Sequence, residues 1–413
     1  MRYWIFTQDI TGTTLAARLL MEGCEVYYSL IPPKKPADND DGYKEILNGF
    51  KVHKIPFAQA KKALLNNNFQ KEYKVIFSLN NEPEFADDLR RKGYSVLGSS
   101  VFGQKLEHDR KFGLDVMKQC GIPVPESQEF SRIEDGLKFL QTKGAGKRWV
   151  IKPDDCGENL TFVSPDNDVL SRYMQAYADK INKTFVLQEV KDGITASCEG
   201  WFDGQKFVFF NCTLEKKRES AGDVGCNLGC RGDLCFAVSP NDRLVRDGVA
   251  KIAPILKKAG YRGMIDLNQI VTKDQIWGLE WTPRFGYNGS MTLIGEVLAL
   301  PLNKVIESFA NGNFGAIKPK NKFGMSLNVD VSFPKNNLPI MVRDDQAYPH
   351  LWFYDVKGTK QGLATTGCEH EVLILTASGQ NVQEASLPHT CGGEPYSLKG
   401  AVISFSSSPH MWG

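Results

Sequence analysis

Two acidic side chains, Asp266 and Glu280, lie on neighbouring β-prone runs of the sequence, residues 264–271 and 276–282. The runs flank the polar turn 272–275, which predicts a β-hairpin that brings the two carboxylates close together, within one residue of register. Carboxylates on neighbouring strands repel each other, and a divalent cation removes that repulsion. Because Mg²⁺ is commonly held by one or two protein carboxylates together with water and substrate phosphates, the hairpin is a candidate magnesium site.

Two more side chains near the carboxylates could take part in the same chemistry. Asn268 follows Asp266 by two residues, so it points to the same strand face and could offer another oxygen. Arg284 follows the second run beyond Pro283, where its planar fork could grip a phosphate or a carboxylate. The alternative interpretation is an exposed hairpin with solvated acids, since charged side chains are mostly exposed.

Composition argues against several other classes of protein. A net charge of +2 gives no electrostatic reason to expect nucleic acid or an anionic membrane as a partner. The start MRYWIFTQDI lacks the basic and apolar regions of a signal peptide, and no stretch approaches the roughly 18 apolar residues of a spanning helix. The ten cysteines fit no zinc-ligand spacing and are interpreted as reduced thiols. We therefore expect a cytoplasmic protein.

The order of patterns along the chain predicts three parts and an α/β class, α+β overall. Residues 1–100 alternate apolar runs with helical patterns, as in a doubly wound parallel sheet. We expect an N-terminal α/β domain at 1–103, a central domain at 104–320 with a small mobile subdomain at about 123–190, and a β-rich C-terminal domain at 321–413. The turn at residues 12–14 either offers N–H groups to an anion at a helix N-terminus or is an ordinary strand-to-helix turn.

The hairpin sequence LEWTPRFG, residues 279–286, resembles the metal-binding strand of ATP-grasp ligases, whose usual form is Glu-x-Asn-x-Arg-x-Gly. Glu280, Arg284 and Gly286 match, whereas Thr282 stands where the family usually has a second metal-ligand Asn. Asp266 lies where many ATP-grasp ligases place their other acidic ligand. The resemblance therefore implies ATP as the nucleotide and one or two Mg²⁺ (or Mn²⁺) ions held by this hairpin.

The same resemblance implies a set of nucleotide-binding residues. It places lysines near the nucleotide and its phosphates, and a hinge whose main-chain groups read the purine edge. Thr195 stands where the family has an acid for the ribose hydroxyls, and the nearby Glu199 could substitute for it. The two matching lysines and the three hinge positions are Lys111, Lys152, Gln188, Glu189 and Val190.

Residues 215–230, EKKRESAGDVGCNLGC, resemble a loop of the phosphoribosylamine–glycine ligase family that runs His-Lys-Arg and then Gly-Asp-x-Gly-x-Asn-x-Gly. Two cations could hold phosphate there, and glycines let the backbone approach a ligand. Residues 366–385 resemble the C-terminal domain of the same family. The positions that match in the loop are Lys217, Arg218, Gly222, Asp223, Gly225, Asn227 and Gly229.

The resemblance implies an ATP-dependent carboxylate–amine ligase in which Arg284, Lys217 and Arg218 stabilise the transferring phosphoryl group and Asn227 helps to bind the nucleotide. It implies small-molecule substrates, glycine and phosphoribosylamine, of purine biosynthesis, and a monomer or homodimer. The segment TQDITGTT stands where the family has a Gly-Arg-Glu-His turn, so another amino acid or amine stays open. A catalytically weakened ATP-binding protein and a carboxylate kinase are the alternatives.

Overall fold

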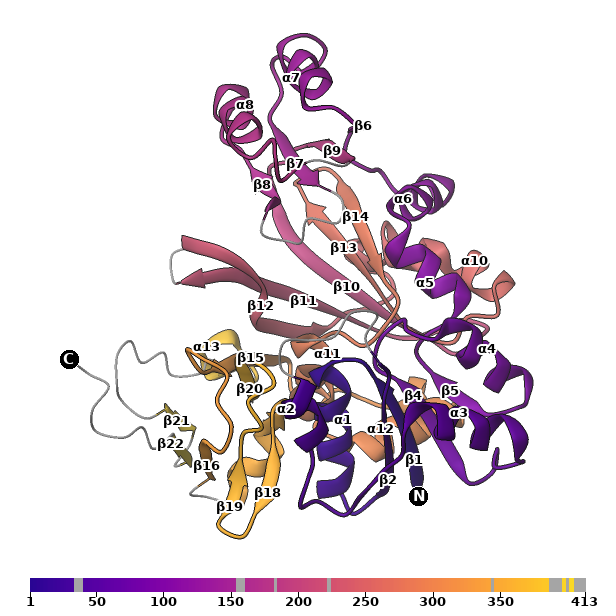
Figure 1. Ribbon diagram of the computed structural model, residues 1–413. Helices are drawn as coiled ribbons and strands as arrows, with labels where there is room; N and C mark the ends of the chain where they lie inside the picture. Colours follow the sequence, from indigo (N-terminus) through magenta and orange to yellow (C-terminus); the bar gives the residue numbers. More distant parts are fainter. Residues whose placement is uncertain are drawn as a thin grey trace, which may run out of the picture.

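The computed structural model describes residues 1–32, 40–153, 160–181, 184–220, 224–342, 345–385, 396–398 and 401–404 (Figure 1). Only the backbone is described at residues 40, 217–220, 224–229, 316, 383, 396–398 and 401–404. The elements form one parallel sheet at the N-terminus and three antiparallel sheets, with helices packed on them. The predicted α/β class is confirmed.

The N-terminal sheet has the strand order β3-β2-β1-β4-β5, and all of its strands run parallel. Alternate residues of β1 face different cores: Tyr3 and Ile5 pack with helix α1, and Trp4 and Phe6 pack with β4 and α4. The sheet is therefore covered on both faces, as doubly wound folds require. The elements are β1 (Arg2–Thr7), α1 (Ile10–Met21), β2 (Glu25–Leu30), α2 (Asp40–Glu45), β3 (Val52–Lys54), α3 (Phe57–Asn66), β4 (Tyr73–Phe77), α4 (Pro83–Arg91) and β5 (Ser95–Leu97).

The turn after β1 differs from the anion-binding alternative. Helix α1 already begins at Ile10, and the Asp9 carboxylate caps it by accepting a hydrogen bond from the Thr11 N–H at 2.9 Å. A Cβ on Gly12 would lie 2.3 Å from Thr7 Cβ, so only glycine fits this close approach. The protein's own carboxylate thus occupies the helix N-terminus, and residues 12–14 are buried in the helix.

The small sheet, in the order β6-β9-β7-β8, stands apart at the top of Figure 1. Its strands are β6 (Ser127–Phe130), β7 (Trp149–Pro153), β8 (Phe162–Val163) and β9 (Phe185–Glu189). Helices α7 (Ile133–Gln141) and α8 (Asn167–Ala176) cover one face, where Trp149, Ile151, Phe185 and Leu187 are buried. The other face, which carries the alternate residues, is turned away from that core.

The large sheet has eight antiparallel strands in the order β14-β13-β10-β11-β12-β15-β20-β17. Strands from beyond residue 320 extend it without a break, because β15 pairs with β12 over residues 232–235. The strands are β10 (Ile194–Phe202), β11 (Phe207–Ser220), β12 (Val224–Ala237), β13 (Gly263–Val271), β14 (Ile276–Thr282), β15 (Phe323–Asp330), β17 (Leu351–Phe353) and β20 (Glu371–Gly379).

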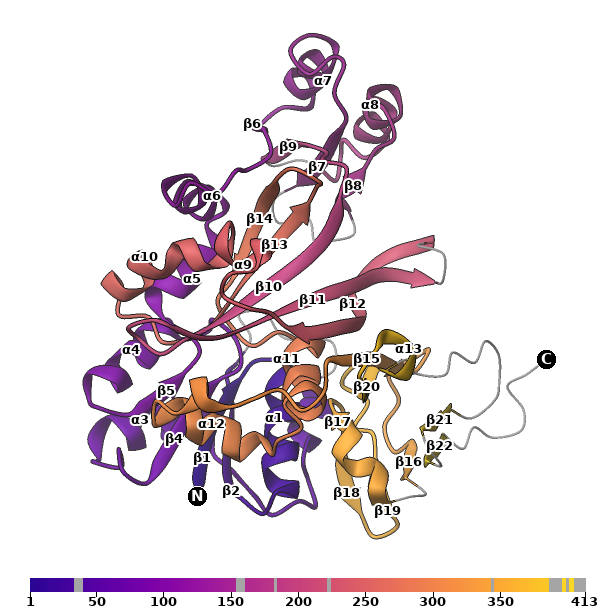
Figure 2. The same cartoon turned by 180° about the vertical axis from the view of Figure 1, so that it is seen from behind.

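Helices pack behind the hairpin of β13 and β14, as Figure 2 shows from the rear. Val116 of α6, Val245 of α9 and Leu256 of α10 share a buried core with Ile265 and Trp281 of the hairpin. These helices are α5 (Val101–His108), α6 (Arg110–Gln119), α9 (Arg243–Arg246), η2 (Val249–Ile252) and α10 (Ala253–Lys258). The hairpin is thus fixed from behind while its other face is left to line cavities.

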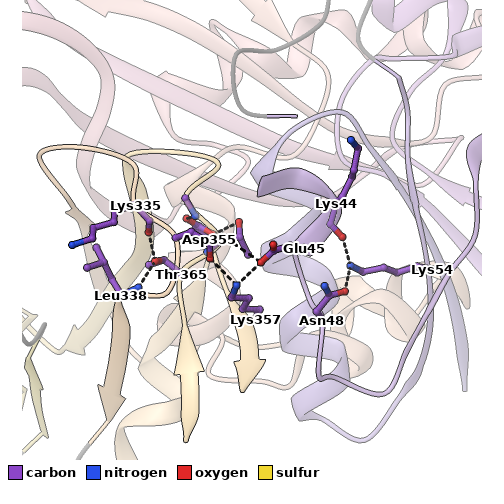
Figure 3. Close-up of polar contacts among 12 residues, drawn as sticks. Lys44, Glu45, Asn48, Lys54, Lys335, Leu338, Asp355, Lys357 and Thr365 are labelled. Atoms are coloured by element: carbon purple, nitrogen blue, oxygen red, sulfur yellow. Dashed lines mark hydrogen bonds and ion pairs between the residues drawn. The ribbon is translucent and has the colours of Figure 1, made fainter. Parts of the chain in front are cut away.

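The remaining elements lie in the lower part of Figure 1. One of them, β18, contacts residues 45 and 48 and so joins the C-terminal part of the chain to the N-terminal part. Lys357 of β18 pairs with Glu45 of α2 (Figure 3). Lys357 also donates to Asn336 Oδ1 at 2.6 Å, and the Gly358 N–H donates to the Asn48 carbonyl at 2.6 Å. The elements are α11 (Asn288–Thr292), the π-helix η3 (Leu293–Val297), α12 (Leu302–Ala310), η4 (Phe314–Ala316), β16 (Pro339–Val342), η5 (Asp345–His350), β18 (Lys357–Thr359), β19 (Gly362–Ala364), α13 (Val382–Ala385), β21 (Tyr396–Leu398) and β22 (Ala401–Ser404).

Candidate active site

Three cavities lie in a row, and the central one, lined by the hairpin of β13 and β14, adjoins each of the other two. The central cavity, of about 160 Å³, is lined by the polar face of β10–β14 and by residues 284–290. The lysine cavity, of about 910 Å³, is lined by α5, α6, β14 and the small sheet, and includes Lys111. The acidic cavity, of about 850 Å³, is lined by residues around Asp9, Arg231 and Glu371. Glu280 lines both the central and lysine cavities, whereas Tyr287 and Asn288 line both the central and acidic cavities.

The register of the hairpin decides where Glu280 points. Asn268 pairs with Glu280 and Asp266 pairs with Thr282, so the two carboxylates are diagonal neighbours rather than directly opposite. Gln269 pairs with Gly278, which leaves Leu279 as an extra residue of a β-bulge. Without the bulge, Glu280 would alternate onto the other face of the sheet. The bulge therefore turns the Glu280 side chain to the face of Asp266 and Asn268.

Asn268 lies between the groups that the sequence assigned to the metal. Its Nδ2 donates to Asp266 Oδ2 at 3.0 Å, and its Oδ1 accepts from Ser197 Oγ at 3.0 Å. Ser197 Oγ also lies 2.7 Å from Glu215 Oε1. Asp266, Asn268 and Glu280 all line the central cavity, where Thr282 also contributes its hydroxyl.

The oxygen donors of this cavity fit a hard cation. Within the described ranges, no group of three or more His, Cys, Asp or Glu side chains is placed to hold a metal ion by itself. Mg²⁺ does not need such a cage, because it is usually bound by one or two carboxylates and takes further oxygens from water and phosphates. Asp266 and Glu280, with the amide oxygen of Asn268 nearby, meet that requirement.

Glu199 lines the central cavity and not the lysine cavity. It pairs across the strands with Asp266, accepts from Asn211 Nδ2 at 3.0 Å and from Ser290 Oγ at 3.2 Å. Burial raises the pKa of Glu199 to about 7. The role of Glu199 at the ribose hydroxyls stays a prediction.

Arg284 also lines the central cavity, but its partner is a protein carboxylate. Its Nε donates to Glu107 Oε1 at 2.9 Å, and its guanidinium lies 5.0 Å from the centre of the Tyr287 ring. Its side chain is only 17% exposed. The Glu107 pair orients the fork at the border of the central and lysine cavities, since Glu107 itself lines the lysine cavity.

The two predicted lysines approach the lysine cavity from different elements. Lys111, at the start of α6, lines it directly. Lys152 of β7 pairs with Val186 of β9, which lines the cavity, whereas Trp149 and Ile151 of the same strand both point into the helix-covered core. Lys152 therefore lies on the sheet face that carries Val186.

The main-chain N–H groups at the predicted hinge already have hydrogen-bond partners within the protein. The N–H of Glu189 donates to the Glu126 carbonyl and the N–H of Val190 donates to the Arg148 carbonyl, both at 2.8 Å. The Gln188 side chain donates to Ser127 Oγ at 3.1 Å. In this conformation the two N–H groups are therefore engaged within the protein and are not available to a purine edge.

The segment around Lys217, Arg218 and Asn227 is not a loop. Residues 215–220 end β11 and residues 224–230 begin β12, and the backbones of Arg218 and Asn227 pair with each other. In Figure 1 the two strands project together from the large sheet. The side chains of Lys217, Arg218 and Asn227, together with Gly222 and Asp223, lie outside the described part of the structure.

Several polar residues of the central cavity were not predicted. They alternate on three adjacent strands, so each points to the cavity face. That period-two pattern is visible in the sequence, but only the strand pairing shows that the three runs share one surface. These residues are Ser197, Thr213, Glu215 and Asp233, with Ser290 at the start of α11.

Comparisons with known proteins agree with this geometry. Residues 108–289 match the family model described as phosphoribosylglycinamide synthetase, ATP-grasp (A) domain. This segment is an ATP-grasp domain. A phosphoribosylamine–glycine ligase of Leptospira interrogans is 24% identical over 281 residues, 65% of this chain and 62% of the relative. The chain thus aligns with somewhat less than two thirds of that protein's length.

Solved structures show the same fold over a longer stretch. A phosphoribosylamine–glycine ligase from Thermotoga maritima matches with a TM-score of 0.65 at 17% identity, covering 93% of this chain and 94% of that one. An L-amino acid ligase from Bacillus licheniformis matches with a TM-score of 0.53 at 13% identity, covering 93% and 94%. Among the described residues, no helix is both long and apolar enough to cross a membrane.

The ATP-grasp domain does not contain the whole site. It holds the hairpin and nearly all of the lysine cavity. The acidic cavity, in contrast, takes Asp9 from the turn between β1 and α1, and Asp330 of β15, Glu371 of β20 and Glu369 just before β20 from beyond the domain. The two ends of the site are therefore built from different parts of the chain.

Proposed function

We propose that the protein is an ATP-dependent carboxylate–amine ligase that uses Mg²⁺. The observation that carries the proposal is the hairpin of the ATP-grasp domain, whose bulge turns Glu280 to the face of Asp266 at the junction of the lysine and central cavities. Phosphoryl transfer consists mostly of positioning and charge neutralisation, so it needs no nucleophilic side chain.

The proposed reaction has two steps. A carboxylate oxygen of the acid substrate takes the γ-phosphoryl group of ATP, which forms an acyl phosphate and releases ADP. An uncharged amine nitrogen then attacks the carbonyl carbon, the C–O bond to phosphate breaks, and inorganic phosphate leaves as the nitrogen loses a proton. When bound, Mg²⁺ neutralises charge that develops on the phosphate oxygens.

Each of the residues at the site has its own proposed role in the reaction. Asp266 and Glu280 hold the cation, and Asn268 orients Asp266 through its 3.0 Å hydrogen bond. Lys111 in the lysine cavity and Lys152 on the sheet face that carries Val186 attract the triphosphate, and Arg284, fixed by Glu107, places positive charge at the border of the central cavity. The substrates in the relatives' names, glycine and phosphoribosylamine, are the first pair to test, and purine biosynthesis is the first pathway class.

Hydroxylamine trapping tests the proposal. The full chain with ATP, MgCl₂ and hydroxylamine is incubated with each of the common amino acids, and both ADP and the hydroxamate are measured. Hydroxylamine captures an acyl phosphate without needing the natural amine. We expect ADP and hydroxamate to appear together with at least one acid. ATP binding without either product would contradict the ligase and favour a catalytically weakened binder, which Thr282 would explain.

A further inference from the structure

The acidic cavity is the place from which an amine can reach the proposed acyl phosphate. It shares Cys230, Tyr287 and Asn288 with the central cavity, whereas the lysine cavity joins the central one at Glu280. Its volume of about 850 Å³ accommodates a small molecule. The position of this acceptor site rests on the proposed function, and its lining gives the class of amine.

The lining carries far more negative than positive charge. Four carboxylates line it together with one guanidinium, that of Arg231, which is ion-paired with Asp330, and one imidazole, that of His370. Among the residues that the structure describes, no ion pair joins Asp9, Glu369 or Glu371. Asp330 Oδ1 is buried and accepts no hydrogen bond from any described group. The cavity thus has unbalanced negative charge and a buried acceptor oxygen.

These carboxylates act on one another. Burial raises the pKa of Glu371, and the charges of Glu369 and Asp9 add to the effect, whereas the hydrogen bond from Asn328 and the charge of Arg231 act in the opposite direction. Burial also raises the pKa of Asp9, which caps α1. Neutral donors supply part of the compensation, since Asn328 Nδ2 donates to Glu371 Oε1 at 2.9 Å and Tyr43 donates to Glu369. A bound cation would relieve the remaining repulsion.

We propose that the acidic cavity binds the acceptor amine and selects amines with a second, positively charged group, such as diamines and polyamines, over phosphorylated amines. One nitrogen attacks the acyl carbon uncharged, while the other stays protonated among Asp9, Glu369 and Glu371. A phosphate group, with a charge of about −1.5 to −2 near neutral pH, would be repelled by the same carboxylates.

A matched series of acceptors tests the charge requirement. Propane diamine, aminopropanol and aminopropyl phosphate share one nucleophile and one chain length but end in a cation, a neutral group and an anion. With the acid identified by hydroxylamine trapping, amide formation by the full chain is measured for each, and for phosphoribosylamine. We expect kcat/KM to fall in that order, with about a hundredfold between diamine and aminopropyl phosphate.

Variants of Glu371 test whether the preference among acceptor amines comes from the acidic cavity. Glu371→Gln should lower the diamine-to-phosphate ratio of kcat/KM about tenfold, and Glu371→Lys should move it further toward the phosphorylated amine. Asp274→Asn, at the exposed turn of the hairpin, is the matched control and should leave the ratio unchanged. Thermal unfolding of each variant checks that it is folded.

The outcomes separate the two proposals. Hydroxamate formation combined with a preference for phosphoribosylamine or aminopropyl phosphate overturns the acceptor class and leaves the ligase intact. An unchanged ratio in folded Glu371→Gln also overturns it. Absence of hydroxamate with every acid overturns the ligase itself, and the acceptor assignment with it.

Discussion

The lysine cavity and the acidic cavity both adjoin the central cavity, yet they are built in opposite ways. The lysine cavity comes almost entirely from the ATP-grasp domain, through residues 106–129, 186 and 279–281. The acidic cavity combines residue 9, residues 230–231 and 287–288, and residues 328–332 and 369–371. Under the two proposals, the phosphoryl-transfer end is built by one domain, whereas the acceptor end also takes residue 9, residues 328–332 and residues 369–371 from three segments outside that domain.

Replacing Glu280 should have the largest effect, because it belongs to the border shared by the central and lysine cavities. Glu280→Gln removes a charged oxygen donor while keeping the size of the side chain. We expect kcat for hydroxamate formation to fall about 10³-fold. Asp274→Asn on the same hairpin is the control for charge alone. Retention of full ATP-dependent activity by Glu280→Gln would remove the hairpin from the reaction.

Replacing Lys152 should affect one cavity and spare the other. Lys152→Met removes a cation from the sheet face that carries Val186, so we expect KM for ATP to rise about ten- to a hundredfold. The ratio of kcat/KM between diamine and aminopropyl phosphate should stay the same. Steady-state kinetics with varied ATP gives the first quantity and the acceptor series gives the second. Wild-type nucleotide affinity in this variant would refute the placement of Lys152.

Replacing residues beside the proposed metal site should have a smaller effect, which is on the Mg²⁺ concentration that the reaction needs. Asn268→Ala removes the hydrogen bond to Asp266 Oδ2, and we expect the Mg²⁺ concentration for half-maximal activity to rise about tenfold. Thr282→Asn, which restores the residue usual at this position in the family, should lower that concentration or leave it alone. A Mg²⁺ titration of both variants measures these shifts. A rise with Thr282→Asn would show that the threonine suits this site better than an amide.

The smallest expected effect concerns stability at the acidic end. Because the pKa of Glu371 is raised by burial and neighbouring carboxylates, its contribution to stability is present below the unfolded pKa and is lost as pH rises through the folded pKa. Glu371→Gln should therefore raise Tm slightly at neutral pH and have little effect in acid. Thermal unfolding at several pH values measures the difference. A lower Tm at neutral pH would show that the charge is compensated in the folded protein.

Much of the fold was predictable because it follows local patterns. The apolar runs of residues 3–6 and 25–30 correspond to β1 and β2, and the turn at 272–275 closes the predicted hairpin. The register of that hairpin was not predictable, since nothing in the sequence marks Leu279 as the extra residue of the bulge. Strand alternation alone placed Asn268 correctly beside Asp266.

The acidic cavity could not be predicted from local sequence. The sequence position of Asp9 is that of an ordinary helix cap, and the residue does cap α1. Glu369 and Glu371 are polar residues before and at the start of β20, and nothing in the sequence marks them as part of a cavity. Only the pairing of β15 with β12 and of β20 with β15 brings residues 330 and 371 beside residue 231. For Glu199 the resemblance suggested the ribose, but the strand pairing with Asp266 placed it in the central cavity.

Isotope transfer from the acid substrate tests the central claim most directly. The acid identified by trapping is prepared with ¹⁸O in its carboxylate and incubated with the full chain, ATP, Mg²⁺ and an amine. If an acyl phosphate forms, one carboxylate oxygen leaves with the phosphate, so mass spectrometry should find one ¹⁸O atom per released phosphate. Phosphate without ¹⁸O would mean that water, not the carboxylate, took the phosphoryl group, and would contradict the ligase mechanism.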